Sequence, residues 1–197
     1  MNRISKRLIS ILIISILTVI PVLSLTGCDK SIVYVEMKVM DFGTVILELY
    51  PDVAPKTVEN FTNLVEEGFY DGLTFHRILS NFMIQGGMPN QDSRELEPIY
   101  GEFSSNGFKN NLLHKRGVIS MARTSMPNSA TSQFFICNAD YPSLDGEYAA
   151  FGRVIEGMDV IDAITAYGMQ YTSYAQNGFI YFTQFQPVIE SMCITER

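Results

Sequence analysis

The chain has few of the side chains from which metal sites and nucleophilic sites are built. Among 197 residues it has two histidines, His76 and His114, and three cysteines, at positions 28, 137 and 193. No combination of these residues has the spacing of a zinc site. Two histidines also give poor support to a catalytic triad based on histidine. The sequence therefore favours chemistry that needs neither a metal nor a covalent intermediate.

Basic residues are also scarce. The chain has 14 Lys and Arg against 21 Asp and Glu, which gives a net charge of −7. This balance argues against nucleic acid as a partner and against an electrostatic attraction to anionic lipid. With 47% hydrophobic and 18% charged residues, the composition is typical of one globular domain, and the sequence has no internal repeat.

The first 28 residues have the organisation of an export signal. Arg3, Lys6 and Arg7 precede an almost wholly apolar run over residues 8–25. Residues 25–28 then read Leu-Thr-Gly-Cys, a small-residue processing site. This motif resembles the lipobox of bacterial lipoproteins, in which the cysteine, here Cys28, is acylated and becomes the first residue. The alternative is an uncleaved membrane anchor.

The resemblance implies a signal peptide at 1–27, a lipidated tether at 28–33 and a folded domain at 34–197. Both alternatives place that domain outside the cytoplasmic membrane, on its outer face or in a periplasmic leaflet. We expect Cys137 and Cys193 to be free and buried, since one pair is not a disulfide framework. Export would also permit a disulfide between them, and the sequence leaves that open.

Short segments of alternating apolar and polar residues dominate the rest of the chain. Apolar residues at helical spacing predict two helices, at 56–67 and 158–167, the first with Pro55 at its start and Gly68 at its end. The pattern predicts an antiparallel sheet that curls on itself, either a barrel or a sandwich. The predicted strands are 31–40, 43–50, two within 75–87, 117–122, 133–137, 149–155 and 187–194.

Residues 75–87, FHRILSNFMIQGG, hold one cation in an apolar strand pair. Arg77 lies in this run, with Gln85 nearby. A charge on a buried face needs a partner or a purpose, because desolvating it is costly. The alternative is that the Arg77 side chain extends along the sheet to solvent.

Four stretches carry a resemblance to a known family. They are KTVENF at 56–61, FHRILSNFMIQGG at 75–87, GVISMARTSMPNSATSQFFI at 117–136 and LDGEYAAFGRVIEGMDVIDAI at 144–164. In this order they closely resemble the cyclophilin family of peptidyl-prolyl cis–trans isomerases, in its bacterial branch. The resemblance implies a mainly β fold, a closed eight-stranded antiparallel barrel capped by two α-helices, with the substrate groove on its outer wall and no cofactor.

The resemblance also implies site residues. Taken singly, the apolar ones would be read as core. The implied catalytic residues are Arg77, Gln85 and Phe82, and the implied substrate-binding residues are Met83, Ala122, Arg123 (through its main chain), Phe135, Leu144 and Tyr148.

Such a set suits the rotation of an X-Pro bond. The barrier to rotation is roughly 18–20 kcal/mol, because rotation breaks amide resonance. Apolar side chains can hold the proline ring, and Arg77 can donate a hydrogen bond to the prolyl nitrogen that becomes pyramidal in the twisted amide. No proton is transferred, so we expect His76 and His114 to be structural, with their hydrogen bonds satisfied.

The chain departs from the family's usual pattern in four places. Ser143 stands where many eukaryotic members have tryptophan, so we expect cyclosporin to bind weakly. Tyr148 stands where those members have histidine, and we expect a contact at the rim of the site, with structural packing as the alternative. Residues 88–98 replace a Gly-rich loop, which bears on selectivity before the proline. Residues 167–185 contain seven aromatic side chains; they predict an excursion packed on the barrel end or an aromatic binding surface.

The sequence thus predicts a monomeric peptidyl-prolyl isomerase that acts on proline-containing exported polypeptides and is anchored by lipid at Cys28. A membrane-tethered chaperone that binds peptides with little turnover is the alternative. A ligand-carrying barrel of the lipocalin kind would need a hollow interior, whereas the many bulky strand residues indicate a filled one.

Overall fold

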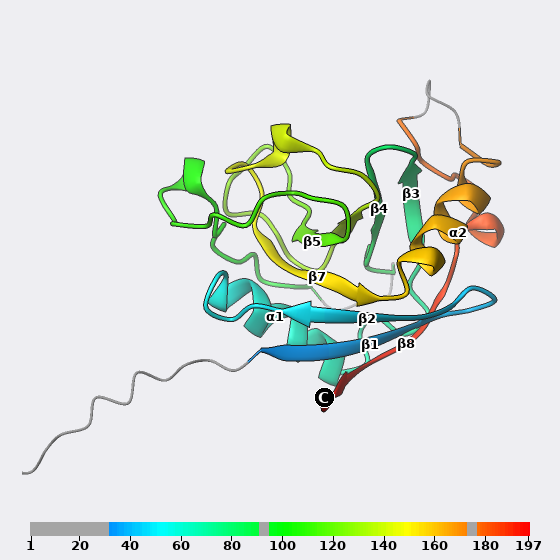
Figure 1. Ribbon diagram of the computed structural model, residues 1–197, viewed down its shortest axis with the longest axis horizontal. Helices are drawn as coiled ribbons and strands as arrows, with labels where there is room; N and C mark the ends of the chain where they lie inside the picture. Colours follow the sequence, from blue (N-terminus) through cyan, green and yellow to red (C-terminus); the bar gives the residue numbers. More distant parts are fainter. Residues whose placement is uncertain (1–31, 91–94, 173–176) are drawn as a thin grey trace, which may run out of the picture.

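The computed structural model describes residues 32–90, 95–172 and 177–197 (Figure 1). The predicted signal peptide at 1–27 and the predicted lipidation site Cys28 lie outside the described residues. Within the described part of the chain, no helix is long and apolar enough to cross a membrane.

All the strands and helices expected from the sequence are present. Helix α1 (Pro55–Glu66) packs against β8, and helix α2 (Met158–Gly168) packs against β2 and β3. Figure 1 shows the two helices at opposite ends of the sheet. One antiparallel sheet has the order β3-β4-β6-β5-β7-β2-β1-β8, formed by β1 (Val33–Val39), β2 (Gly43–Leu49), β3 (Phe75–Leu79), β4 (Met83–Gly86), β5 (Val118–Met121), β6 (Phe134–Cys137), β7 (Ala150–Glu156) and β8 (Ile189–Thr195).

The sheet curls into a half-barrel, and the closure expected from the sequence is not shown. Strands β3 and β8 are its two edges. They meet only at one corner, where Thr74 bridges Val188 and the Phe75 amide donates to the Pro187 carbonyl at 2.9 Å. Further along β3, residues 177–180 occupy the free edge, with a bridge between Arg77 and Phe179. A second segment therefore takes the hydrogen-bonding positions that direct strand pairing would need.

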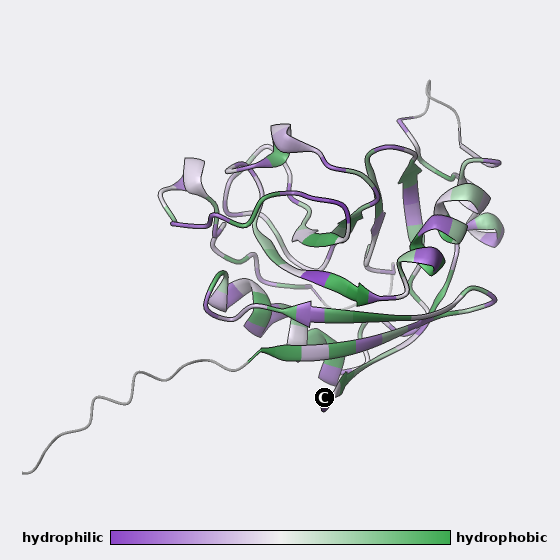
Figure 2. Ribbon diagram, in the orientation of Figure 1, coloured by the Kyte–Doolittle hydropathy of each residue, from purple (hydrophilic) through white to green (hydrophobic). Residues whose placement is uncertain are grey.

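Side chains fill the space inside the half-barrel. The Phe61 ring of α1 lies 5.1 Å from Tyr70, 5.5 Å from Phe134 and 5.2 Å from Phe151, measured between ring centroids. Figure 2 shows hydrophobic and hydrophilic residues alternating along β1, as expected for a strand with one buried face. This packed interior has no room for the hollow cavity of a ligand-carrying barrel.

Strand β7 passes very close to β2 at Gly152. A Cβ at this position would lie 2.4 Å from the Glu48 carbonyl oxygen of the neighbouring strand β2. The register also shifts along both pairings of β7, with β2 and with β5. Only glycine allows β7 to pass β2 this closely.

Helix α1 is capped by a side chain from a distant loop. Pro55 begins the helix as predicted, and Gly68, with φ of 67°, follows its end. Ala54 offers no capping side chain, so the buried Glu102 carboxylate accepts hydrogen bonds from the amides of Lys56 at 3.0 Å and Thr57 at 2.8 Å. A carboxylate at the positive end of the helix dipole satisfies two amides that lack a partner within the helix.

The two cysteines form no disulfide. Cys137 is buried in β6, and burial raises the pKa of its thiol to about 12. Cys193 is exposed on β8, so the expectation that both thiols are buried is wrong for this one. Side chains alternate between the two faces of an edge strand, and Cys193 points to solvent.

His76 contradicts the expectation of a satisfied histidine. Its side chain is buried in β3, and neither ring nitrogen has a hydrogen-bond partner among the described residues. Burial lowers the pKa of His76 from 6.5 to about 4, because desolvation penalises the charged ring. The fold therefore holds His76 in its neutral form.

We predict that replacing Glu102 by alanine lowers the free energy of unfolding by about 2 kcal/mol. The substitution leaves one buried and one partly buried amide of the first turn without an acceptor, which costs roughly 1–3 kcal/mol in proteins. Denaturant unfolding would measure the loss. Glu190→Gln, which changes an exposed glutamate on β8, is the control and should stay near the wild-type value.

The burial of His76 predicts a stability that depends on pH. The pKa of His76 in the folded protein lies below its unfolded value of 6.5. The stability that neutral His76 contributes is therefore fully present above pH 6.5 and is lost as the pH falls toward 4. A shift from 6.5 to about 4 corresponds to roughly 3 kcal/mol at most. The free energy of unfolding should therefore change less between pH 7 and pH 4.5 for His76→Phe than for the wild type. Equal differences for the two proteins would contradict this assignment.

Candidate active site

The strands β3, β4, β6 and β5 carry an apolar cluster on each face. Alternate residues of β4 and β6, such as Ile84 and Ile136, point into the main core. Their neighbours point outward and form a separate cluster on the outer wall. This outer cluster consists of Met83, Phe135, Cys137 and Leu144, with Leu79, Phe82, Ala122 and Tyr148 packed against it.

Strand register brings the polar site residues to the same face. Arg77 of β3 is paired with Gln85 of β4, and Gln85 is paired with Phe135 of β6. Residues directly opposite one another on adjacent strands project to one side, so the three side chains form a row across the sheet. The row explains why residues far apart in the sequence belong to one site.

Phe82 reaches the site from the turn between β3 and β4. Asn81, with φ of 56°, makes the reversal. Asn138 fixes it: its Oδ1 accepts a hydrogen bond from the Phe82 amide at 2.7 Å, and its Nδ2 donates to the Leu79 carbonyl at 2.8 Å. The Phe82 ring then packs on Tyr141, with ring centroids 4.3 Å apart.

The outer cluster opens into a pocket of about 270 Å³. All nine residues expected at the catalytic and substrate-binding site line it. Sequence reasoning missed two further residues, Asn177 and Phe179; the aromatic richness of 167–185 was a signal, but it did not place the segment at the site. The lining residues are Arg77, Phe82, Met83, Gln85, Ala122, Arg123, Phe135, Leu144, Tyr148, Asn177 and Phe179.

Arg77 is held in the pocket by neutral groups. Its Nε donates to the Asn177 carbonyl at 2.9 Å, and its Nη1 donates to the Gln85 Oε1 at 3.3 Å. The guanidinium carbon lies 5.8 Å from the centroid of Phe82 and 5.6 Å from that of Phe179, within range of cation–π attraction. Among the described residues, no carboxylate forms an ion pair with Arg77 and no acceptor binds its Nη2 group.

Partial burial lowers the pKa of Arg77 below its usual value, through desolvation. An arginine nevertheless keeps its charge at any physiological pH. The side chain is thus a permanent cation turned toward an apolar pocket, with donors left over. The alternative, in which Arg77 extends along the sheet to solvent, does not describe this geometry.

Arg123 and Tyr148 form the opposite rim. The Arg123 guanidinium carbon lies 4.8 Å from the Tyr148 ring centroid, and its Nη2 donates to the Glu147 carbonyl at 2.9 Å. The Tyr148 ring in turn meets Phe135 edge-on, with centroids 5.7 Å apart. The Arg123 side chain is therefore engaged in the rim. Ser143 is exposed and does not line the pocket.

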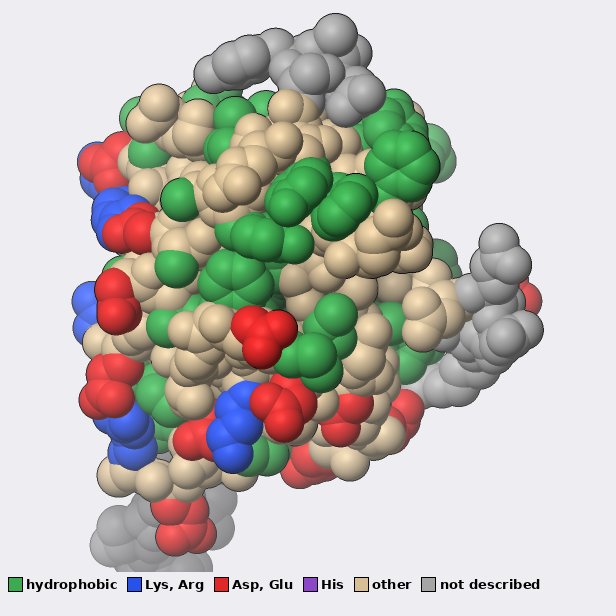
Figure 3. Space-filling view, turned by 90° about the vertical axis from the view of Figure 1, so that its right-hand side faces the viewer, with side chains coloured by type: hydrophobic (Ala, Val, Ile, Leu, Met, Phe, Trp, Pro, Cys, Tyr) green, Lys and Arg blue, Asp and Glu red, His purple; other side chains and the backbone are tan. Residues whose placement is uncertain are grey.

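Hydrophobic side chains extend beyond the pocket on the face that carries α2. Figure 3 shows them gathered on that face, with most of the charged side chains to one side and below. Residues 177–185 contribute to this surface, with the Tyr181 side chain 68% exposed and Phe182 66% exposed. The described part of this aromatic segment packs on the sheet edge at residues 177–180 and exposes the rings of Tyr181 and Phe182, whose use as a binding surface stays a prediction.

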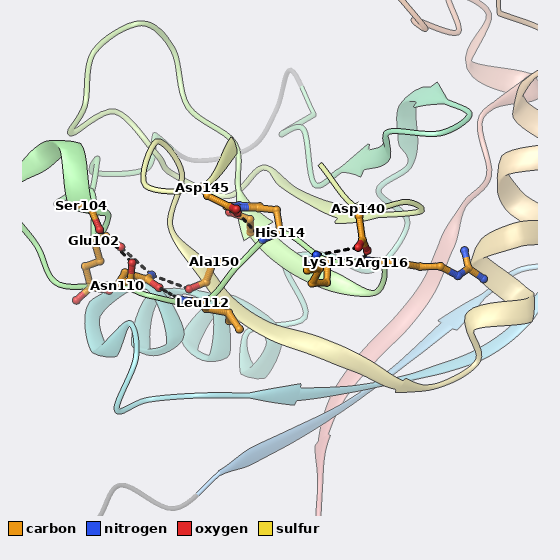
Figure 4. Close-up of polar contacts among 11 residues, drawn as sticks. Glu102, Ser104, Asn110, Leu112, His114, Lys115, Arg116, Asp140, Asp145 and Ala150 are labelled. Atoms are coloured by element: carbon orange, nitrogen blue, oxygen red, sulfur yellow. Dashed lines mark hydrogen bonds and ion pairs between the residues drawn. The ribbon is translucent and has the colours of Figure 1, made fainter. Parts of the chain in front are cut away.

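A buried polar network supports the pocket floor from below. His114 Nδ1 lies 3.0 Å from Asp145 Oδ1 (Figure 4). Its Nε2 lies 3.1 Å from Ser120 Oγ. The imidazole stacks on Phe135 with centroids 5.9 Å apart. His114 is thus a satisfied structural histidine, as predicted. Ser120 has no exposed surface, so this Ser-His-Asp arrangement cannot meet a substrate.

The described residues include no group of three His, Cys, Asp or Glu side chains that could hold a metal ion. The pocket instead combines an apolar floor with the Arg77 guanidinium and the Gln85 carboxamide on one side and with Arg123 at the opposite rim. Such a site can bind an uncharged ring and stabilise a developing lone pair.

Comparison with known proteins gives the same family throughout. Relatives named peptidyl-prolyl cis-trans isomerase include one from Acinetobacter baylyi, 47% identical over 148 residues that cover 68% of this chain and 76% of the relative. Another, from Streptomyces antibioticus, is 47% identical over 133 residues, 62% of this chain and 77% of the relative.

Solved structures agree. A cyclophilin type peptidyl-prolyl cis-trans isomerase of Cryptosporidium parvum has a TM-score of 0.70 and 26% identity, and covers 85% of this chain and 99% of its own. Its structure in the presence of the dipeptide Ala-Pro has a TM-score of 0.68 and 27% identity, with 83% and 99% covered. The family model for cyclophilin type peptidyl-prolyl cis-trans isomerases matches residues 34–179. The chain therefore belongs to the cyclophilin type peptidyl-prolyl cis-trans isomerase family.

Proposed function

We propose that this protein catalyses the cis–trans isomerisation of X-Pro bonds in exported polypeptides, as a lipid-anchored monomer on the outer face of a membrane. One observation carries the catalytic part of the proposal. Arg77 lies in an apolar pocket with neutral partners only, and its Nη2 has no described acceptor.

The pocket would hold the proline ring over Phe135, between Met83 and Leu144. The residue before proline would lie along the main chain of Ala122 and Arg123 at the other rim. Holding the two sides of the bond separately allows the amide between them to twist. The reaction needs no cofactor, because only a rotation takes place.

Arg77 would act only on the twisted amide. In the planar amide the prolyl nitrogen shares its electron pair with the carbonyl group and accepts no hydrogen bond. As the bond twists, this pair localises on nitrogen, and an Arg77 N–H can donate to it. An interaction made only in the transition state raises the rate of the chemical step. Gln85 would keep the guanidinium in position through its Oε1.

Comparisons support proline as the recognised residue. The relatives of similar sequence are named peptidyl-prolyl cis-trans isomerases, and the Cryptosporidium parvum structure was solved in the presence of Ala-Pro. Ser143 leaves the pocket without a tryptophan wall, so we propose that cyclosporin binds weakly. Inhibition by cyclosporin in the nanomolar range would contradict that point.

We predict that Arg77→Ala lowers kcat/KM for a proline-limited peptide by roughly 10²–10³-fold, the usual effect of removing one donor to a transition state. A protease-coupled isomerisation assay would measure it, and the thermal unfolding midpoint would show that the fold is kept. Arg153→Ala is the control, because Arg153 is an exposed partner of Glu48 outside the pocket. It should retain the wild-type rate.

Wild-type turnover by Arg77→Ala would overturn the mechanism. The second candidate, a tethered peptide-binding chaperone, is favoured by the exposed rings of the aromatic segment. Suppression of aggregation that survives Arg77→Ala, but is lost when Tyr171 and Phe182 become alanine, would support that candidate.

The membrane location rests on the sequence at 1–28. We predict that a labelled fatty acid is incorporated into the full-length protein in bacterial cells, and that Cys28→Ser abolishes this incorporation. Cys193→Ser is the control, since Cys193 is an exposed free thiol in the folded domain. Equal labelling of Cys28→Ser and wild type would exclude Cys28 as the lipidated residue.

A further inference from the structure

The segment 177–180 is built onto the edge of β3 directly beside Arg77. The Ile78 amide donates to the Gly178 carbonyl at 2.8 Å, and the Ile180 amide donates to the His76 carbonyl at 2.9 Å. A Cβ at Gly178 would lie 2.4 Å from Leu79 Cγ, and Gly178 has φ of 79°. Glycine is therefore required for this close approach, and the approach fixes the position of the next residue, Phe179.

Phe179 has one face packed and part of its ring open. The ring stacks on His76, with centroids 6.1 Å apart and planes 29° apart. The Arg77 guanidinium carbon lies 5.6 Å from the ring centroid. The side chain is nevertheless 36% exposed, and the residue lines the pocket. An aromatic ring kept partly uncovered at a binding pocket is a surface for an apolar group of a ligand.

The strand order gives the direction in which a peptide crosses the pocket. From one rim to the other, the lining passes from Ala122 after β5, across β6 and β4, to Arg77 of β3 and then to Phe179. If the residue before proline lies at the β5 rim and the ring lies over β6, the residue after proline lies over β3. Phe179 is on that side.

We propose that Phe179 is a specificity-determining residue that binds the side chain following proline and selects apolar or aromatic residues there. The proposal rests on the proposed isomerase function of the same pocket. Phe82 forms the other wall of this subsite, since its ring centroid lies 5.8 Å from the guanidinium carbon of Arg77. A side chain after proline would thus enter between two rings, above a cation that is already bound by Asn177 and Gln85.

The test compares two peptides that share the residue before proline and differ after it, X-Pro-Phe and X-Pro-Gly. We expect Phe179→Ala to lower kcat/KM for X-Pro-Phe about tenfold more than kcat/KM for X-Pro-Gly, with the difference mainly in KM. Phe179→Leu should recover part of the loss. Tyr181 is an exposed aromatic residue close to Phe179 in the sequence, and it does not line the pocket. Tyr181→Ala should therefore leave kcat/KM unchanged for both peptides.

An equal loss on both peptides would overturn the proposal, because Phe179 would then act only by positioning Arg77. No loss on either peptide would overturn it as well. Affinity measured by titrating the two peptides into wild type and Phe179→Ala gives an independent readout. A wild-type preference for X-Pro-Phe that Phe179→Ala abolishes would support the subsite even if no turnover occurred, in which case only the proposed isomerase function would fail.

Discussion

The site depends on a cation to which the described residues supply no counter-charge. An ion pair would neutralise Arg77 and occupy its donors, whereas the Asn177 carbonyl and the Gln85 carboxamide hold the guanidinium and leave its charge intact. The rings of Phe82 and Phe179 add cation–π attraction on its flanks. Desolvating the Arg77 guanidinium costs free energy, and a ligand that presents an electron pair to it recovers part of that cost. Isomerisation of an X-Pro bond requires such a cation, because the nitrogen of the twisted amide presents an electron pair.

The sheet makes this possible by using both of its faces. A filled interior leaves no cavity inside the half-barrel, so a binding site must lie on the outer wall. Outward residues of β4 and β6, such as Met83 and Phe135, supply the apolar floor. The edge of β3 supplies the remaining wall, because residues 177–180 pair with it in place of β8. The same contacts protect an exposed strand edge and complete a pocket.

Loops carry the other rim, and buried polar groups fix their positions. Glu102 ties the long loop after β4 to the start of α1, and Asp145 ties the segment that carries Leu144 to His114. Each of these carboxylates has its hydrogen bonds inside the protein, so the residues next to Glu102 and Asp145 have few alternative placements. A rim held in this way keeps Leu144 and Tyr148 at a fixed distance from the cation on the far side of the pocket.

Alternation and helical spacing in the sequence by themselves determined the strands and the helices, because these patterns are encoded over short distances. The motifs that resemble the cyclophilin family implied the set of site residues that includes Arg77. The sequence did not place Phe179 at the pocket, since that contact joins residues about a hundred positions apart. Nor did it reveal that the ring nitrogens of His76 have no hydrogen-bond partner among the described residues, or that Cys193 is exposed. The order of the strands and the pairing at the edges of the sheet decide the position of Phe179, the surroundings of the His76 ring and the exposure of Cys193. Both depend on tertiary packing, which the periodicity of the sequence does not predict.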